Sequence, residues 1–190
     1  RAEEEAIVAE ERRMFHFLHD LGEAIWRDDQ QASMYRLIVE GAIRVTQSTG
    51  GALYLLDEAT QRLVPRHYSE FCAPLIDVPE RVRQQMKDNP AALLNLLRMH
   101  ALMTEEGLLG GVFSEQKTVL VGDLGADTRL SSKLAIQEGV TAMIGPLSFG
   151  KRKLGVLAVT SPKAGRSYNA NDFEVFNSLI EQSAFGLANA

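Results

Sequence analysis

The sequence predicts an α+β fold, in which an antiparallel sheet carries helices gathered on one of its faces. Two observations lead to this prediction. Apolar residues recur at helical spacing near both ends of the chain, whereas the middle contains short apolar runs separated by turns. Several of those runs follow one another without a helix between them. This order favours an antiparallel sheet, because a doubly wound parallel sheet needs a helix between every pair of strands.

The first segment, roughly residues 3 to 28, is expected to be a helix with a narrow apolar seam. The seam is formed by Ile7, Met14, Leu18, Leu21 and Ile25. The stretch before Met14 is dense in Glu and Arg, so it has little apolar surface to bury within its own domain. A seam of this kind is typical of a helix that pairs with a partner helix. We therefore expect residues 1–28 to form a signalling and dimerisation helix and residues 29–190 to form the globular domain.

A second helix and a hairpin are expected next. After the polar stretch RDDQQ, Ser33 is placed to cap a new helix, which ends at the cluster Ser48, Thr49, Gly50 and Gly51. The runs ALYLL and RLVPRHY then flank the short polar segment DEATQ. Two apolar runs joined in this way predict a β-hairpin.

The stretch from Ser69 to Glu106 is expected to be a helical excursion. VPERVRQQMKDNP and AALLNLLRMH each have the composition of a helix, with Pro79 and Pro90 where helices can begin. The second piece has an unusually wide apolar face, so it must pack against something.

The remainder of the chain alternates short elements. GLLGGVFSEQ predicts a short helix, TVLVGD a strand, and SKLAIQEG a short helix that stops at Gly139. VTAMIGPLSF and KLGVLAV predict two strands joined by a turn at Gly150. The last helix is expected to begin at Asn171, with Glu174 completing a capping box. In LGVLAVTSPK the apolar residues are almost unbroken, so this strand is expected to be central and covered on both faces, with Gly155 marking a close approach.

Composition excludes several classes of function. The formal net charge is −5 and no basic cluster stands out, so nucleic acid is not expected as a partner. No apolar run is long enough to cross a bilayer and the first residues are charged, so we expect a cytoplasmic segment with neither a membrane span nor a signal peptide. Cys72 is the one cysteine, which excludes an internal disulfide and a thiolate zinc cluster. No metal site is expected.

Three stretches together resemble a GAF domain: GGALYLLDEATQRLVPRHY, GLLGGVFSEQKTVLVGDLGADTRLSS, and the segment from EGVTAMIGPLSF to the end of the chain. The resemblance covers about residue 20 to residue 190. It implies an antiparallel sheet of about six strands, with the N- and C-terminal helices on one face and the helical excursion and a ligand pocket on the other.

The resemblance also implies two sets of functional residues. The pocket is expected to be formed by Tyr54, Leu56, Phe113, Asp123, Thr128 and Met143. A parallel homodimer is expected to form through Met14, Leu18, Leu21 and Ile25 of the first helix, with Phe176 and Ile180 of the last helix beside them. Val156, on the strand LGVLAV, is expected to be buried.

The ligand-binding motifs known in the family are poorly matched by this sequence. Cyclic-nucleotide-binding members carry an Asn-Lys pair where this chain has Ser161 and Pro162, and an Asp-Glu pair where it has Asp172 and Phe173. Bilin-binding members attach the pigment through a cysteine that the family places later in the chain than Cys72. The free methionine sulfoxide reductases of this fold need several cysteines. The cofactor or ligand is therefore left unknown.

No nucleophile, metal or phosphate-binding constellation stands out, so a binding role is favoured over an enzymatic one. The interpretation is a regulatory GAF-type sensor of a bacterial regulator, which binds a small molecule and signals through dimerising helices to an output domain elsewhere in a longer chain. Two alternatives stay open. One is a ligand-free dimerisation or interaction module whose pocket is filled by the Leu93–Met99 helix, and the other is a cyclic-nucleotide-binding domain.

Overall fold

The computed structural model describes residues 1–162, 164 and 167–190, with the side chains of residues 10, 17, 18 and 20–28 outside the description. The chain divides into two compact units, Arg1–Met34 and Tyr35–Ala190. One helix, α1 (Ala2–Val45), runs through both. The two helices expected on either side of RDDQQ are therefore one continuous helix, and the expectation of a helix break there was wrong. RDDQQ contains neither Pro nor Gly, and Arg and Gln are good helix formers, so this polar stretch continues the helix rather than ending it.

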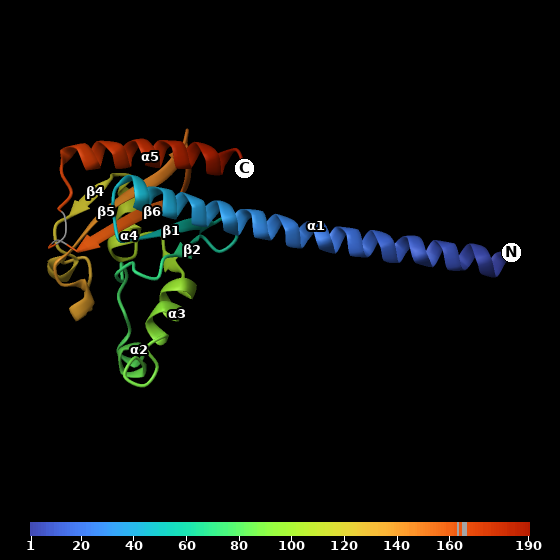
Figure 1. Ribbon diagram of the computed structural model, residues 1–190, viewed down its shortest axis with the longest axis horizontal. Helices are drawn as coiled ribbons and strands as arrows, with labels where there is room; N and C mark the ends of the chain where they lie inside the picture. The colour runs from blue at the N-terminus through green and yellow to red at the C-terminus, as the bar shows by residue number, and fades with distance from the viewer. Residues whose placement is uncertain (163, 165–166) are drawn as a thin grey trace. The chain divides into compact units, whose positions relative to one another are not determined.

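The sheet has six strands in the order β3-β2-β1-β6-β5-β4, and every neighbouring pair is antiparallel (Figure 1). This confirms the α+β prediction. The expected hairpins are present, whereas the two-residue strand β3 was not foreseen. The strands are β1 (Gly50–Asp57), β2 (Arg62–Tyr68), β3 (Leu102–Met103), β4 (Val119–Val121), β5 (Val140–Phe149) and β6 (Arg152–Pro162).

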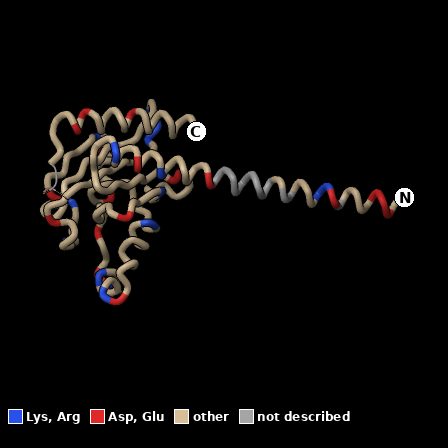
Figure 2. The backbone as a smooth tube through the Cα atoms, viewed as in Figure 1, with Lys and Arg blue, Asp and Glu red and all other residues tan. Residues whose placement is uncertain are grey.

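The shorter helices follow the predicted order. They are α2 (Glu80–Gln85), α3 (Ala92–Met99), α4 (Gly107–Glu115), the 3-10 turns η1 (Leu124–Ala126) and η2 (Ala135–Gln137), and α5 (Ala170–Ala188). Acidic and basic residues stand side by side on α2 (Figure 2). The helix predicted before Gly139 is only a 3-10 turn, and Gly139 has the positive φ expected of a stop.

The last helix begins two residues earlier than predicted. Asn169 is the N-cap, and its side chain accepts a hydrogen bond from the backbone N–H of Asp172, 2.9 Å away. The Asp172 carboxylate accepts in return from the Asn169 N–H at 2.8 Å. Asn171 and Glu174 offer the same residue types at a similar spacing, which explains why the sequence pattern selected the wrong pair.

The two faces of the sheet belong to separate apolar cores. On one face, Val39 and Ala42 of α1 and Phe176 of α5 pack against strand residues such as Leu157. On the other face, the excursion and α4 cover a second set of strand residues, for example Val156. None of the helices in the described part of the chain is both long and apolar enough to span a membrane.

Strand β6 lies at the centre of the sheet, paired with β1 on one side and β5 on the other. Its residues from Leu154 to Ser161 are all buried, as expected for a strand covered on both faces. A Cβ atom at Gly155 would overlap the backbone of Tyr54 and Leu55 in β1. Gly155 therefore marks a close approach of a neighbouring backbone, as the sequence predicts, and the β1–β6 pairing tolerates no side chain there.

We predict that Gly155→Ala destabilises the domain by about 1 to 3 kcal/mol, because the added methyl group must push two paired strands apart. Gly111→Ala is the matched control, since a Cβ at Gly111 on α4 meets nothing within 4 Å. Alanine is the better helix former, so the control should be neutral or slightly more stable. Denaturant unfolding measures both changes, and equal stability of the two variants would show that the strands can separate without cost.

Candidate ligand-binding site

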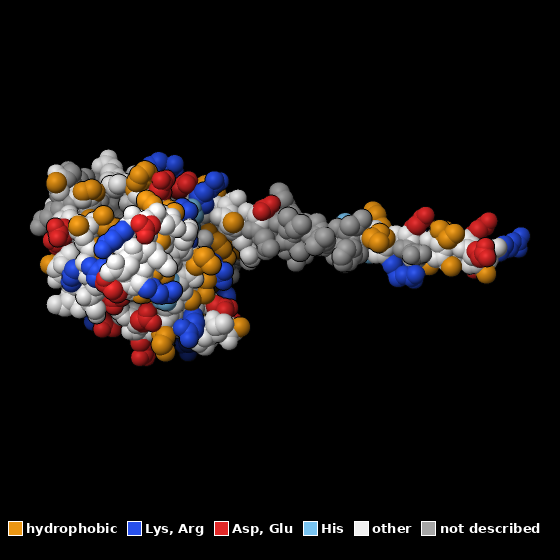
Figure 3. Space-filling view, turned by 90° about the horizontal axis from the view of Figure 1, so that it is seen from below, with side chains coloured by type: hydrophobic (Ala, Val, Ile, Leu, Met, Phe, Trp, Pro, Cys, Tyr) orange, Lys and Arg blue, Asp and Glu red, His pale blue; other side chains and the backbone are white. Residues whose placement is uncertain are grey.

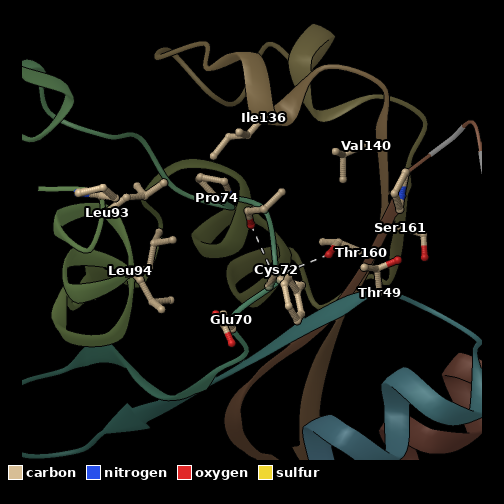
Figure 4. A pocket seen from close by; sticks show the side chains of 15 residues that line it. Thr49, Glu70, Cys72, Pro74, Leu93, Leu94, Ile136, Val140, Thr160 and Ser161 are labelled. Carbon is tan, nitrogen blue, oxygen red and sulfur yellow. Dashed lines mark hydrogen bonds between the residues drawn. The ribbon is translucent and has the colours of Figure 1, made fainter. Parts of the chain in front are cut away.

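A cavity of about 320 Å³ lies on the face of the sheet opposite α1 and α5 (Figure 4). Its lining comes from segments far apart in the sequence: the residue before β1, the loop after β2, helix α3, the turn η2, and the adjoining ends of β5 and β6. Because antiparallel pairing places the start of β5 beside the end of β6, Val140 pairs with Pro162 at the cavity wall. The volume is in the range of small-molecule sites.

Helix α3 forms one apolar wall of the cavity. Leu93, Leu94 and Leu97 line it from this helix, and Ile136 and Val140 line it from across the opening (Figure 4). The wide apolar face noted in the sequence for this helix thus serves both the cavity and the core, since Leu97 is also part of the core beneath the cavity. With α3 in place, the cavity remains open rather than filled by the helix.

The opposite end of the cavity carries hydroxyl groups. Thr49, Thr160 and Ser161 line this end, and the Thr160 hydroxyl donates a hydrogen bond to the Cys72 sulfur at 3.8 Å. Within the described residues of the lining, Glu70 alone has a formal charge and no cationic side chain is present. The site therefore combines an apolar wall with a few uncharged hydrogen-bonding groups.

A chain of hydroxyl groups leads from this end of the cavity to helix α1. The Tyr168 hydroxyl lies 3.3 Å from the Ser161 hydroxyl and 2.5 Å from that of Ser48. The Ser48 hydroxyl lies 2.6 Å from that of Thr46, which donates to the carbonyl of Ala42 on α1 at 2.7 Å. Burial raises the pKa of Tyr168, although its hydrogen bonds to Ser161 and Ser48 act in the opposite direction. Tyr168 therefore stays a neutral hydroxyl that can both donate and accept.

Cys72 is a buried, unreactive part of the wall. Burial raises the pKa of its thiol to about 12, while hydrogen bonds with Thr160 and Tyr68 act to lower it. The thiol is therefore protonated at neutral pH, and a protonated thiol is neither a nucleophile nor a good metal ligand. The residue belongs to the apolar core on this face of the sheet.

Two loops are fastened together at the cavity rim. The side-chain amide of Gln137 is fully buried and donates to the Pro74 carbonyl at 2.9 Å. The Asp77 carboxylate accepts from the backbone N–H groups of Ser131 and Ser132 at 2.6 and 3.1 Å. These bonds hold in place the walls that carry Pro74 and Ile136, so the cavity is largely formed before any ligand binds.

The six residues predicted for the pocket do not line the cavity of Figure 4. Tyr54 belongs to the core on the excursion face, whereas Met143 belongs to the core beneath α1 and α5. Neighbouring residues of a strand point to opposite faces, so transfer of a family layout that is wrong by one position selects the wrong face. This prediction was wrong as a set.

The other four residues of the predicted set belong to the core or pack against it, cap a turn, or are exposed. Phe113 is in the same core as Tyr54, and Leu56 packs against that core. Asp123 caps η1, and its carboxylate accepts from the N–H groups of Gly125 and Gly139 at 2.8 and 3.0 Å. Thr128 is exposed. None of them lines the cavity of Figure 4. The residues that do were signalled by the apolar face of α3 and by the hydroxyl pair that ends β6.

The predicted dimer residues fall into three groups. Met14 is exposed on α1. Leu18, Leu21 and Ile25 lie outside the described side chains. Phe176 and Ile180 are buried against the sheet within a single chain, so they cannot form the surface of contact with a second chain. That part of the dimer prediction was wrong, because the apolar stripe of α5 faces its own domain.

The fold agrees with comparisons to known proteins. A family model described as GAF domain matches residues 29–188. The chain therefore belongs to the GAF domain family, as the sequence resemblance predicts. No curated protein matches the chain.

Solved structures share the fold at low identity. A GAF domain/HD domain protein from Geobacter sulfurreducens has a TM-score of 0.64 at 12% identity, over 84% of this chain and 92% of its own. The GAF-B domain of DevS from Mycobacterium smegmatis has a TM-score of 0.55 at 17% identity, over 84% of this chain and 95% of its own. Free methionine-R-sulfoxide reductase from Neisseria meningitidis has a TM-score of 0.52 at 16% identity, with 83% of each chain covered. The last of these is an enzyme, so the fold alone does not separate regulatory from catalytic members.

Proposed function

We propose that this chain is a regulatory GAF sensor domain that binds a small molecule in the cavity of Figure 4 and has no catalytic activity of its own. The observation that carries the proposal is the cavity that remains beside α3. If α3 filled the site, a ligand-free interaction module would be the better interpretation. The unreactive Cys72 thiol supports a binding role over the reductase chemistry of the neisserial relative.

The lining favours a neutral and mostly apolar ligand with one hydrogen-bonding end. Leucine side chains on α3 would cover its body, and Thr160 and Ser161 would meet its polar end. A cyclic nucleotide is disfavoured, because a phosphate needs cationic or multiple N–H donors and the lining offers a carboxylate instead. Asp172 stands where cyclic-nucleotide-binding members carry the Asp of their Asp-Glu pair, but here its carboxylate caps α5.

The hydroxyl chain supports signalling towards the helices. A ligand that hydrogen-bonds to Ser161 would compete with Tyr168 for that hydroxyl. Tyr168 would then donate its single proton to Ser48, three residues beyond the end of α1. A ligand changes an equilibrium only through such a difference in contacts between two states. Tyr168 also directly precedes the cap of α5, so both helices on the far face adjoin the same group.

Helix α1 carries exposed apolar residues that could pair with a second copy of the chain. The exposed residues Ile7, Val8, Met14 and Phe15 form two pairs seven positions apart on α1, which is the spacing of a coiled-coil seam. We propose a cytoplasmic homodimer through this helix, in a bacterial regulator with an output domain elsewhere in the full-length chain. The similar GAF domain/HD domain protein of Geobacter gives an example of a GAF domain joined to another domain.

The ligand proposal is tested with two fluorescent probes of matched shape. N-phenyl-naphthylamine is neutral and apolar, and anilinonaphthalenesulfonate has the same rings with an added sulfonate. We expect the neutral probe to bind saturably and the sulfonate to bind about tenfold or more weakly, a difference of about 1.4 kcal/mol or more. Fluorescence titration measures both affinities. Tighter binding of the sulfonate would contradict a neutral-ligand site.

A pair of variants on the same helix locates the binding. Leu93→Trp fills the cavity, whereas Leu96→Trp places the same indole on a part of α3 that does not line it. The first variant should lose the neutral probe and the second should keep it, with both still folded by circular dichroism. Equal affinity in the two variants would place the probe elsewhere on the protein.

The dimer proposal is tested by replacing two seam residues with charge. Ile7→Glu combined with Met14→Glu should convert the protein to monomer, because two carboxylates would face their copies across the seam. The control combines Glu5→Gln with Arg12→Gln, positions about 200° around the helix from Ile7 and Met14. Light scattering reports the mass. A wild type that is already monomeric at high micromolar concentration would disprove the dimer.

A further inference from the structure

A second hollow, chemically unlike the cavity of Figure 4, lies at the outer edge of β2. Its volume is about 310 Å³, and it is lined by Arg66, His67, Tyr68 and Arg98. Figure 3 shows basic, acidic and apolar side chains interspersed on one face of the globular unit. Helix α3 contributes to both sites, with Leu94 and Leu97 lining the apolar cavity and Arg98 lining the second hollow.

The hollow arises from an irregularity in strand pairing. Leu53 pairs with His67 but Tyr54 pairs with Pro65, so Arg66 is an extra residue with no partner on β1. A β-bulge of this kind redirects side chains and often lies beside a functional site. On the outer side, β3 pairs only with Arg62 and Leu63, which leaves the rest of the edge to other contacts. One of these is a hydrogen bond of 3.4 Å from Arg98 Nε to the Tyr68 carbonyl.

The cationic groups of this hollow have unused hydrogen-bond donors. The bond to Tyr68 holds Arg98 at one nitrogen only. Among the described residues no carboxylate is within ion-pair distance of Arg66 or Arg98. A guanidinium group presents a planar fork that matches two oxygens of a carboxylate or phosphate. Two such groups line this hollow, and its lining, within the described part of the chain, contains no acidic side chain.

His67 is the natural reporter of this site. Burial lowers the pKa of its imidazole, Glu40 of α1 raises it, and Arg98 and Arg36 lower it further. Two arginines therefore line the hollow, and Arg36 and Glu40 lie close enough to His67 to affect its pKa. A bound anion would stabilise the imidazolium form, so the pKa of His67 would rise on binding.

We propose that this hollow binds a small anion through its carboxylate or phosphate group, with Arg66 and Arg98 as the primary ligands and His67 beside them. This hollow is separate from the cavity proposed for the neutral ligand, although helix α3 contributes to both. Its position beside Arg36 and Glu40 places it next to the part of α1 that covers the sheet.

The test follows the imidazole resonances of the full chain by NMR at neutral pH, during titration with inorganic phosphate and separately with succinate. We expect a saturable shift of His67 towards its protonated form with at least one of the two probes. Phosphate alone would indicate a phosphoryl ligand, and succinate alone would indicate a carboxylate ligand. No saturable shift of His67 with either probe would overturn the proposal.

Charge-matched variants complete the test. Arg98→Gln and Arg66→Gln should each weaken binding by about tenfold or more, since each removes charged hydrogen bonds. Arg81→Gln removes the same charge from α2, away from the hollow, and should leave the affinity unchanged. Equal weakening by Arg81→Gln and Arg98→Gln would mean that the shift reports net charge only, which would contradict a built site. Thermal unfolding confirms that each variant is folded.

Discussion

The pairing of β1 with β6 is the constraint on which the rest of the structure depends. It brings Tyr54 and Gly155 so close that no side chain fits between them, and it fixes which residues of both strands face each side. Alternate residues of β6 then supply the two cores, Val156 to one and Leu157 to the other. Because α1 and α5 occupy one face and the excursion the other, the sheet separates a cavity from the helices that we propose respond to it.

If the domain is a sensor, a ligand in the cavity on one face of the sheet must affect the helices on the other face. The connection lies at the end of the sheet rather than through it. Thr49 donates its backbone N–H to the carbonyl of Thr160 at 2.9 Å, which fastens the start of β1 to the end of β6 beside the cavity. The hydroxyl chain through Tyr168 passes round this same end. Buried polar networks of this kind have few alternative arrangements, so a change at one member is felt by the next.

Much of the fold could be predicted because it depends on local patterns. Periodicity, capping residues and turn residues placed most elements, and a glycine inside an apolar run indicated the close approach at Gly155. The misplaced elements were those where two local signals compete, as with Asn169 and Asn171 at the start of α5, or where a polar stretch carries no true stop, as in the middle of α1.

Most of the candidate site could not be predicted from the sequence, because its residues are brought together by the tertiary fold. The cavity is lined by residues that are far apart in the sequence and share no motif, such as Thr49, Cys72, Leu94 and Ser161. The folded chain alone brings them together. The face on which a strand residue lies changes with every position, so an approximate family alignment placed Tyr54 and Met143 together although they lie on opposite sides. The bulge that leaves Arg66 unpaired likewise has no sequence signal of its own.

The central claim is that the cavity is coupled to α1 through the Tyr168 hydroxyl. Backbone hydrogen exchange at Thr46 and Ser48, whose N–H groups bond to Ala42 and Ile43 of α1, tests it most directly. With N-phenyl-naphthylamine bound, we predict a change in the exchange rates of these two amides in the wild type. The change should be absent from Tyr168→Phe, which keeps the ring but lacks the hydroxyl, while the probe still binds. An identical change in both proteins, or none in the wild type, would contradict the account.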